Sequence, residues 1–336
     1  MKTVLVTGAG GYIGSITSRQ LLAAGYRIVA ADNFSRGYRE PLEKLAALYP
    51  GRLVVEDLNL VFESHKLFNK HPEIGAVMHF AALLNVGESM KIPVEYFSNN
   101  VVGTQNLLEA TVGHGVRHLV FSSSCTVYGN AQYLPIDEAH PISKPESVYG
   151  QTKRICEDIL EWYDRLGKLR YAALRYFNVC GATDDGEFGD SKRPSFHLMQ
   201  NAVRGALGLQ PFRFNYAAVN TPDGSPVRDY VNVVDLADAH VAALAYLERT
   251  DTTQAFNLGT GTGNSVLEIV NKVQQITGRQ FEVDSDPDRR TGEADKMVAN
   301  YAKARELLGW EPRRSLEQSV QSLVTWYGKY PGGWRR

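Results

Sequence analysis

The sequence has few cysteines and lacks the cysteine and histidine motifs that bind metals. Its 336 residues include three cysteines and eight histidines. Cys125, Cys156 and Cys180 are odd in number and far apart, which argues against a disulfide framework and against a CxxC redox or metal motif. No HExxH pattern occurs. We therefore interpret the three cysteines as small buried hydrophobic residues and expect no metal site.

A long apolar run and an excess of one charge are also missing. No apolar stretch approaches the ~20 residues needed to span a bilayer, and the N-terminal residues enter a strand-like run without a cleavage-type signal. Lys and Arg number 36 against 37 Asp and Glu, so the formal net charge of -1 provides no broad basic surface. We expect a soluble, cytoplasmic protein with no nucleic-acid or membrane partner, in which local groups hold any anionic ligand.

Short apolar runs alternate with helix-like stretches through the first half of the chain. The apolar runs lie at residues 3–8, 27–32, 53–57, 76–82, 118–124 and 171–179, and helix-like stretches lie at 15–24, 100–111 and 149–166. Because the runs are continuous rather than alternating, they indicate a parallel sheet buried on both faces. The order of elements predicts an α/β fold with a doubly wound parallel sheet.

The second half of the chain has a different texture. Two polar, turn-rich segments, 181–194 and 220–227, are too long to be simple connections, and loops of that kind often carry binding groups. A strand and a helix then return after residue 226. We predict a large domain over residues 1–178, which 227–260 rejoins. A smaller C-terminal α/β domain would be formed by 179–226 and 261–336.

The first strand is followed by a glycine-rich turn, in the stretch VLVTGAGGYIG. Gly8, Gly11 and Gly14 follow a GxxGxxG spacing and leave backbone N–H groups free for a diphosphate at the start of a helix. Asp32 ends the second strand, where an acid accepts hydrogen bonds from ribose hydroxyls and repels a 2′-phosphate. The pattern therefore favours NAD. Arg36 leaves NADP open as an alternative, and close helix packing would be a purely structural use of the glycines.

Tyr149 and Lys153 are four residues apart in a helix-like stretch, SVYGQTKRICE. On a helix this spacing places both side chains on one face. An ammonium beside a phenol favours the phenolate and lowers the phenol pKa, which would make Tyr149 a general base. The pair alone is weak evidence, because such spacing also arises by chance. A cofactor site in the same chain gives the pair something to act with.

Three motifs in this order, TGAGGYIG, FSSSCTVYG and YGQTK, resemble the extended short-chain dehydrogenase/reductase family, and the resemblance extends nearly end to end. It implies that the large domain is Rossmann-like and keeps NAD bound, and that the smaller domain holds a UDP-sugar. The implied reaction interconverts UDP-galactose and UDP-glucose by transient oxidation at C4, through a 4-keto intermediate. The resemblance also implies a homodimer formed by helices of the large domain, including the one that carries Tyr149.

The resemblance assigns three catalytic residues. Tyr149 would be the base, Lys153 would bind the nicotinamide ribose and lower the tyrosine pKa, and Ser124 would hold the sugar 4-hydroxyl. A serine hydroxyl suits this position because it both donates and accepts hydrogen bonds. A serine at a strand end can also simply satisfy the backbone.

Binding residues follow from the same resemblance. Those expected to bind NAD are Gly8, Gly11, Tyr12, Ile13, Gly14, Asp32, Asn33, Ser35, Asp57, Leu58, Phe80, Ala81, Ala82, Leu83, Asn99, Ser122, Tyr149, Lys153 and Tyr176. Those expected to bind the UDP-sugar are Ser124, Tyr149, Asn178, His197, Leu198, Arg228, Arg290 and Glu293. Guanidinium groups suit a diphosphate because they present several fixed donors. Core packing would explain Phe80 and Leu83 equally well.

Two other functions stay open. One is a different NAD-dependent nucleotide-sugar enzyme, either an epimerase of UDP-pentoses, UDP-uronates or UDP-N-acetylhexosamines or a dehydratase. Cys125 and Thr126 follow Ser124 where dehydratases of this superfamily carry an Asp-Glu pair, which weighs against dehydration. The other is a cofactor-binding sensor or structural protein without catalysis.

Overall fold

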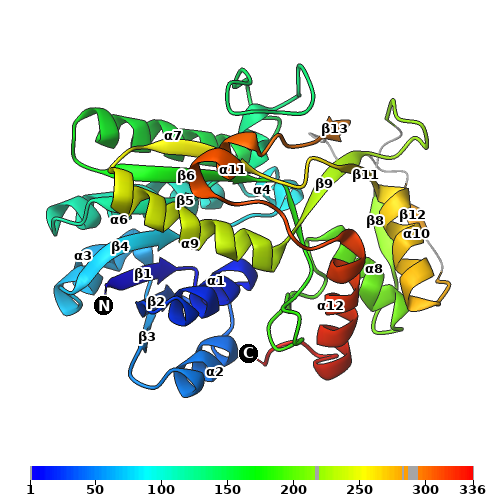
Figure 1. Ribbon diagram of the computed structural model, residues 1–336, viewed down its shortest axis with the longest axis horizontal. Helices are drawn as coiled ribbons and strands as arrows, with labels where there is room; N and C mark the ends of the chain where they lie inside the picture. The colour runs from blue at the N-terminus through cyan, green and yellow to red at the C-terminus, as the bar shows by residue number, and fades with distance from the viewer. Residues whose placement is uncertain (1, 216–218, 282–283, 287–293, 336) are drawn as a thin grey trace.

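The computed structural model describes residues 2–215, 219–281, 284–286 and 294–335, and these form a large sheet-based lobe beside a smaller one (Figure 1). The strands of the large sheet are β1 (Thr3–Thr7), β2 (Arg27–Asp32), β3 (Leu53–Asp57), β4 (Ile74–His79), β5 (His118–Ser122), β6 (Arg170–Tyr176) and β10 (Gln254–Leu258). Their order is β10-β6-β5-β4-β1-β2-β3, and every neighbouring pair is parallel. The doubly wound, Rossmann-like α/β fold is therefore confirmed.

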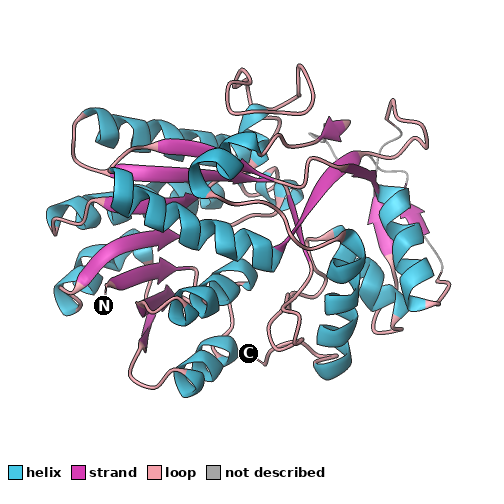
Figure 2. Ribbon diagram, viewed as in Figure 1, coloured by secondary structure: helices cyan, strands magenta, loops and turns pink. Residues whose placement is uncertain are grey.

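Helices cover both faces of this sheet (Figure 2). One face carries α1 (Tyr12–Ala23), α2 (Glu40–Leu48) and α9 (Val233–Thr250), and the other carries α3 (Leu60–Lys70), α6 (Gly103–Gly113) and α7 (Val148–Arg165). Side chains of β1 alternate between the two resulting cores: Val4 and Val6 face the first, and Leu5 faces the second. The sheet is therefore buried on both faces, as its continuous apolar runs require.

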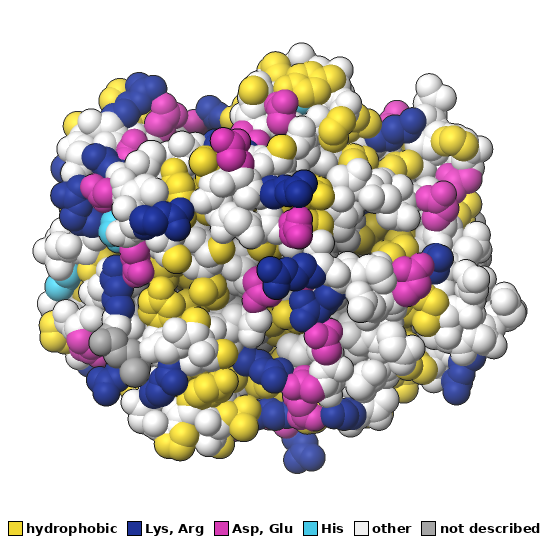
Figure 3. Space-filling model, viewed as in Figure 1, with side chains coloured by type: hydrophobic (Ala, Val, Ile, Leu, Met, Phe, Trp, Pro, Cys, Tyr) yellow, Lys and Arg dark blue, Asp and Glu magenta, His cyan; other side chains and the backbone are white. Residues whose placement is uncertain are grey.

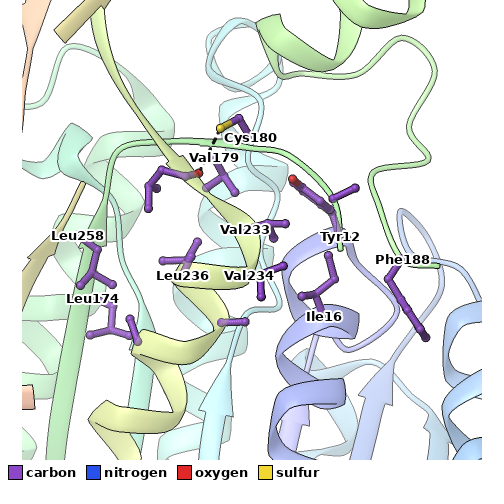
Figure 4. Close-up of a cluster of buried hydrophobic side chains, with 14 of the residues drawn as sticks. Tyr12, Ile16, Leu174, Val179, Cys180, Phe188, Val233, Val234, Leu236 and Leu258 are labelled. Atoms are coloured by element: carbon purple, nitrogen blue, oxygen red, sulfur yellow. Dashed lines mark hydrogen bonds between the residues drawn. The ribbon is translucent and has the colours of Figure 1, made fainter. Parts of the chain in front are cut away.

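Helices α1 and α9 pack against each other across the first core. Figure 4 shows Val233 and Val234 of α9 on the side of that helix nearest Ile16 of α1, whereas Leu236 lies on the other side, toward Leu174 and Leu258. Ile16 and Leu236 are fully buried. Because α1 begins at the glycine-rich turn, this packing fixes the direction in which the first turn of α1 points.

The smaller lobe is built on short strands. β7 (Asn178–Cys180), β9 (Val227–Asn232), β11 (Gly263–Ser265) and β13 (Lys296–Met297) form one sheet, and β8 (Arg213–Asn215) pairs with β12 (Asp284–Asp286). Three helices pack around them: α8 (Leu198–Ala206), α10 (Val266–Thr277) and α12 (Leu316–Lys329). The remaining elements are α4 (Val86–Ser89), α5 (Pro93–Tyr96), the π-helix η1 (Phe97–Val102), the 3-10 helix η2 (Cys125–Tyr128) and α11 (Ala302–Leu308).

The structure divides the apolar run 171–179, which we expected to be one strand. Strand β6 belongs to the large sheet, and β7 pairs with β9 in the small sheet. Phe177 lies between them, and its backbone N–H donates to the carbonyl of Leu258. Within 227–260, β9 lies in the small sheet, whereas α9 covers the large sheet and β10 extends it. The domain boundaries stay a prediction.

Candidate active site

One large cleft, of about 1250 Å³, opens where the loops after the strands of the large sheet meet the smaller lobe. Small-molecule sites typically enclose ~300–1,000 Å³, so this cleft has room for more than one ligand. It lies at the carboxyl ends of β1 and β4, where the strand order reverses and doubly wound folds bind ligands. The expected site residues that line it are Gly8, Gly11, Tyr12, Ile13, Gly14, Asp32, Asn33, Ser35, Leu58, Phe80, Ala81, Ala82, Leu83, Asn99, Ser122, Ser124, Tyr149, Lys153, Tyr176, Asn178, His197 and Arg228.

The glycine-rich turn has a shape that only glycine permits. Gly8 adopts a φ of +68°, and a Cβ on it would lie 2.7 Å from the backbone nitrogen of Ala81. A Cβ on Gly14 would collide with the carbonyl oxygen of Gly8, so α1 packs directly on the turn. Gly11 caps α1 without a side-chain hydrogen bond, which leaves the first N–H groups of the helix available to an anion.

Asp32 stands beside this turn at the end of β2. Its Oδ2 accepts a hydrogen bond from the Gly10 N–H at 2.9 Å, and its Oδ1 accepts one from the Phe34 N–H at 2.8 Å. Burial raises the pKa of its carboxyl, and these two bonds oppose that rise. A diphosphate cradle next to a fixed acid fits the diphosphate and adenosine ribose of NAD.

Tyr149 and Ser124 come from different elements and meet in the cleft. Tyr149 is the second residue of α7, and Ser124 follows β5 and caps η2. The Ser124 Oγ accepts hydrogen bonds from the N–H of Thr126 at 3.3 Å and from its hydroxyl at 3.0 Å. Ser124 interacts with the phenol and partly lowers the Tyr149 pKa. The backbone-capping role and the site role expected for Ser124 are therefore compatible in one geometry.

Lys153 lies one helical turn beyond Tyr149, and its environment differs from what the spacing suggested. Its ammonium donates to the Ser122 carbonyl at 2.7 Å and lies 6.0 Å from the centre of the Tyr149 ring. Burial lowers the pKa of Lys153 to about 8. The Tyr149 pKa is raised rather than lowered, because burial of the phenol outweighs the other influences. The expected lowering of the Tyr149 pKa therefore requires positive charge near the phenol in addition to that of Lys153.

Residues 80–83 line the cofactor side of the cleft and form what we call the cofactor wall. A buried asparagine in the π-helix η1 connects this wall to α7. Asn100 Oδ1 accepts from the Leu83 N–H at 2.8 Å, and its Nδ2 donates to the Leu83 carbonyl at 2.9 Å and to the Thr152 hydroxyl at 3.1 Å. Thr152 in turn donates to the Tyr149 carbonyl at 2.7 Å. Phe80, on the same wall, lines the cleft and also packs on His240, with ring centres 4.7 Å apart, so both of its expected roles coexist.

On the substrate side, the expected residues occupy different settings. Arg228 donates to the Val227 carbonyl at 2.9 Å and faces the cleft. His197 packs against Tyr12 with ring centres 5.6 Å apart, and burial lowers its pKa. Leu198 begins α8 and packs against the core, outside the cleft lining.

Three other expected residues are absent from the list of residues that line the cleft, for different reasons. Asp57 ends β3 with an exposed side chain that pairs with Arg39. Arg290 and Glu293 lie outside the described residues. The roles of these three stay predictions.

Ser89, in a VGES segment that resembles a loop at the family's substrate pocket or a helix cap, supports α7: its Oγ accepts from the Tyr149 N–H at 3.1 Å and so anchors the first turn of the helix. A buried ion pair was missed from the sequence. Glu157 of α7 forms a buried pair with Arg175 of β6 at 2.6 Å. Four-residue spacing from Lys153 places Glu157 on the same helix face and could have drawn attention to it, whereas nothing local marks Arg175 as its partner.

The surface carries no dominant charge in the view of Figure 3, where Lys and Arg side chains are interspersed with Asp and Glu. In the part of the chain that the structure describes, no group of three or more His, Cys, Asp or Glu side chains is arranged to hold a metal ion. None of the described helices combines the length and apolar character needed to cross a membrane.

Comparisons with known proteins agree with this geometry. Residues 4–259 match the NAD dependent epimerase/dehydratase family. The chain is 42% identical over 329 residues to a UDP-glucose 4-epimerase of Rhizobium leguminosarum bv. trifolii, with 98% of each chain covered. It is 40% identical over 337 residues to a UDP-glucose 4-epimerase of Lacticaseibacillus casei, again with 98% of each covered. The UDP-glucose 4-epimerase of Bifidobacterium longum, solved with NAD+ and UDP, superposes with a TM-score of 0.93 at 34% identity, covering 99% of this chain and 100% of that one.

Proposed function

The chain belongs to the NAD-dependent epimerase/dehydratase family, and from this premise we propose how its cleft interconverts UDP-galactose and UDP-glucose. It is an NAD-dependent isomerase that acts at C4 of the sugar. The single observation that carries the residue assignment is the meeting of Tyr149, Ser124 and Lys153 beside the glycine-rich turn in one cleft. These three side chains supply a proton acceptor, a two-way hydrogen-bonding group and a fixed cation.

NAD, when bound, supplies the hydride acceptor and the positive charge of its oxidised nicotinamide ring. Tyr149 takes the proton of the sugar 4-hydroxyl and later returns it to the 4-keto oxygen. C4 inverts because hydride is returned to the opposite face of that carbon. Ser124 passes hydrogen bonding between the sugar oxygen and the phenol. Lys153, whose pKa is about 8, is mostly charged at neutral pH and stabilises the phenolate.

Inversion requires the 4-keto sugar to turn over between the two half reactions. The UDP portion must therefore be held firmly while the sugar is held loosely. Arg228, Asn178 and His197 surround the substrate side of the cleft, and we assign them to the nucleotide and diphosphate. Arg290 and Glu293 are proposed contacts of the same nucleotide.

Dehydration is disfavoured by the residues that follow Ser124. Elimination needs an acid and a base near the sugar. Cys125 occupies the first of the two positions where dehydratases of this superfamily carry an Asp-Glu pair. Burial raises the pKa of its thiol to about 12. Thr126 uses its hydroxyl to donate to Ser124 at 3.0 Å. Neither side chain is suited to transfer a proton at neutral pH.

The activity is tested by incubating the purified protein with UDP-galactose in the absence of added cofactor and separating the UDP-sugars by chromatography. Formation of UDP-glucose without accumulation of NADH is the expected result, because NAD is regenerated in each cycle. Parallel incubations with UDP-N-acetylhexosamines, UDP-pentoses and UDP-uronates identify the preferred sugar. If only one of these other UDP-sugars were converted, the assignment of UDP-galactose and UDP-glucose as substrates would be contradicted, and the mechanism would still apply.

We also propose that the protein is a homodimer formed through helices of the large domain, including α7. Several large apolar side chains on this side of the molecule are exposed, among them Val94 at 78%, Trp162 at 61% and Leu166 at 62%. Light scattering coupled to size exclusion should give twice the chain mass. Trp162→Arg should shift that mass toward the monomer.

A further inference from the structure

A lysine that the family resemblance does not assign, Lys192, reaches the cofactor side of the cleft from a loop that follows the small-lobe strand β7. It lines the same cleft as the glycine-rich turn. Its side chain is half-buried, and its ammonium lies 4.9 Å from the centre of the Phe196 ring, which also lines the cleft. None of the described carboxylates forms an ion pair with it. Its charge therefore lies at the cleft wall against the Phe196 ring and has no ion-pair partner among the described residues.

The backbone on either side of Lys192 is firmly anchored. The carbonyl of Asp190 accepts from the Trp326 indole and from the Tyr327 hydroxyl, both at 3.1 Å. The Lys192 carbonyl accepts from Arg204 at 3.0 Å, and the Ser191 Oγ accepts from the Trp334 N–H at 2.9 Å. Helices α8 and α12 and the residues after α12 thus hold this segment in place.

The same segment lies over the diphosphate cradle. The Tyr38 hydroxyl donates to the Ser191 carbonyl at 3.0 Å, and the Tyr38 N–H donates to the Gly10 carbonyl at 2.9 Å. One residue therefore links the glycine-rich turn to the position next to Lys192. At the other end of the segment, His197 packs on Tyr12, the first residue of α1.

Charges near Lys192 indicate which diphosphate it meets. Burial lowers the pKa of Lys192, and Arg36 adds to that lowering. Asp190, Asp32 and Glu88 oppose it without reversing it. Asp32 ends β2 and Arg36 follows it, at the adenosine end of a cofactor bound at this turn. Arg36 is already paired with Glu88 at 2.8 Å, so it is less available to a phosphate.

We propose that the Lys192 ammonium binds the diphosphate of NAD, on the side opposite the backbone N–H groups of the glycine-rich turn. Backbone donors cover one side of the doubly charged group, and a lysine on the other side adds a charge-assisted hydrogen bond. The small lobe thereby holds the cofactor as well as the substrate. The inference rests on NAD as the cofactor of the proposed function and is independent of which sugar is converted.

The test measures nucleotide binding, without turnover. Lys192→Met, Lys192→Arg and wild type are stripped of nucleotide and titrated calorimetrically with NAD, ADP-ribose, adenosine and UDP. Lys66→Met is the matched control, because Lys66 is 79% exposed on α3, outside the cleft, and the substitution makes the same change in charge. Circular dichroism and melting temperature verify that each variant folds.

The Kd of NAD and of ADP-ribose should rise about 10- to 100-fold in Lys192→Met, as expected for loss of a hydrogen bond to a charged group. Adenosine and UDP should bind as in wild type, and Lys192→Arg should retain most of the affinity. The protein should also lose NAD during purification, which is measured from the absorbance of nucleotide released on denaturation. Added salt should weaken NAD binding more in wild type than in Lys192→Met.

Three results would each overturn the proposal. Unchanged NAD affinity with a lower melting temperature would mean that Lys192 only balances Asp190. Weakened UDP binding with unchanged ADP-ribose binding would assign Lys192 to the substrate diphosphate. Equal weakening of adenosine and NAD would indicate general damage to the cleft. Failure of the wild type to convert UDP-galactose would leave all of these binding results interpretable, and so would separate this inference from the proposed function.

Discussion

Tyr149 illustrates how one side chain depends on groups brought from several elements. Its position is set by Ser89, which accepts from its backbone N–H, and by Thr152, which donates to its carbonyl. Its phenol is buried, which raises the pKa, while Ser124 acts in the opposite direction. The phenol is therefore protonated at neutral pH until positive charge in addition to that of Lys153 is placed beside it. In the proposed mechanism, binding of NAD and activation of Tyr149 as the base are therefore coupled.

Tyr149→Phe removes only the hydroxyl and should leave the helix intact. We expect kcat to fall by about 10²- to 10⁴-fold, the usual contribution of a positioned general base. Bound NAD per chain and the Kd of UDP should be unchanged. Tyr163→Phe, on the same helix, is the matched control and should keep wild-type kcat. Near-normal turnover of Tyr149→Phe would remove this residue from the mechanism.

The sequence was informative about residues whose chemistry is tied to a local motif. The glycine-rich turn, Asp32 and the Tyr149–Lys153 pair could be recognised because spacing along one helix or turn determines their geometry. Lys192 could not, because it lies in a polar loop without periodicity and reaches the cleft only through contacts with α8 and α12. The burial that raises the Tyr149 pKa in the chain alone could not be predicted from spacing either, since burial is a property of the folded chain.

At the scale of elements, the π-helix η1 determines how the cofactor wall meets α7. Asn100 satisfies both the N–H and the carbonyl of Leu83, and it also reaches Thr152. Such wide turns often occur at functional sites. Nothing in the sequence marks this one, because residues 97–113 follow one continuous helical pattern. The division of 171–179 between β6 and β7 was missed for a similar reason, since a change of sheet leaves the apolar run uninterrupted.

Asn100→Leu should destabilise the protein and loosen the cofactor wall. It leaves the buried backbone groups of Leu83 without their partner, at a cost of about 1–3 kcal/mol for each unsatisfied group. We expect the free energy of unfolding to fall by roughly 2–4 kcal/mol in urea, with weaker NAD binding. Asn106→Leu, which removes one bond to the Val61 carbonyl, should cost about 0.5–1.5 kcal/mol and spare NAD. Equal effects of the two changes would contradict a special role for Asn100.

The Glu157–Arg175 pair joins α7 to β6 beneath the site. Arg175 donates to Glu157 and, at 3.0 Å, to the Tyr128 hydroxyl, and Ser123 also donates to Glu157. Arg175→Met should lower the free energy of unfolding by about 3–5 kcal/mol, because it strands a buried carboxylate. Adding Glu157→Leu should restore part of that loss. A double-mutant cycle in urea measures the coupling, and additive costs would show that the pair acts as two separate residues.

The whole molecule contains buried neutral histidines that respond to acid. His79 accepts or donates hydrogen bonds to Thr7 at 2.7 Å and Thr104 at 2.8 Å, and burial lowers its pKa to about 3. Burial also lowers the pKa of His240 to about 4. Both ordinary values are 6.5, so below that pH the unfolded chain binds protons that the folded chain does not. Stability is therefore complete above pH 6.5 and is lost as the pH falls.

Between pH 6.5 and pH 5.5 we expect the two histidines together to reduce the free energy of unfolding by about 2 kcal/mol. The carboxyls of Asp185 and Glu187, with pKa values lowered to about 2, stay ionised in the folded protein over this interval. Urea unfolding at several pH values gives the slope. His79→Asn should make the free energy of unfolding depend less steeply on pH. His65→Asn, at an exposed position, should leave that dependence unchanged. An unchanged slope in His79→Asn would assign the acid response to other groups.

The place of α9 and β10 in the fold has a consequence for synthesis on the ribosome. These two elements come from residues 233–258, yet α9 covers α1 and β10 completes the edge beside β6. A nascent chain that ends before residue 233 already contains the glycine-rich turn and α7, but it leaves Ile16 and Leu21 of α1 exposed. It also carries an unpaired strand edge, which is prone to aggregation. Cellular chaperones should therefore bind these chains until α9 and β10 have emerged.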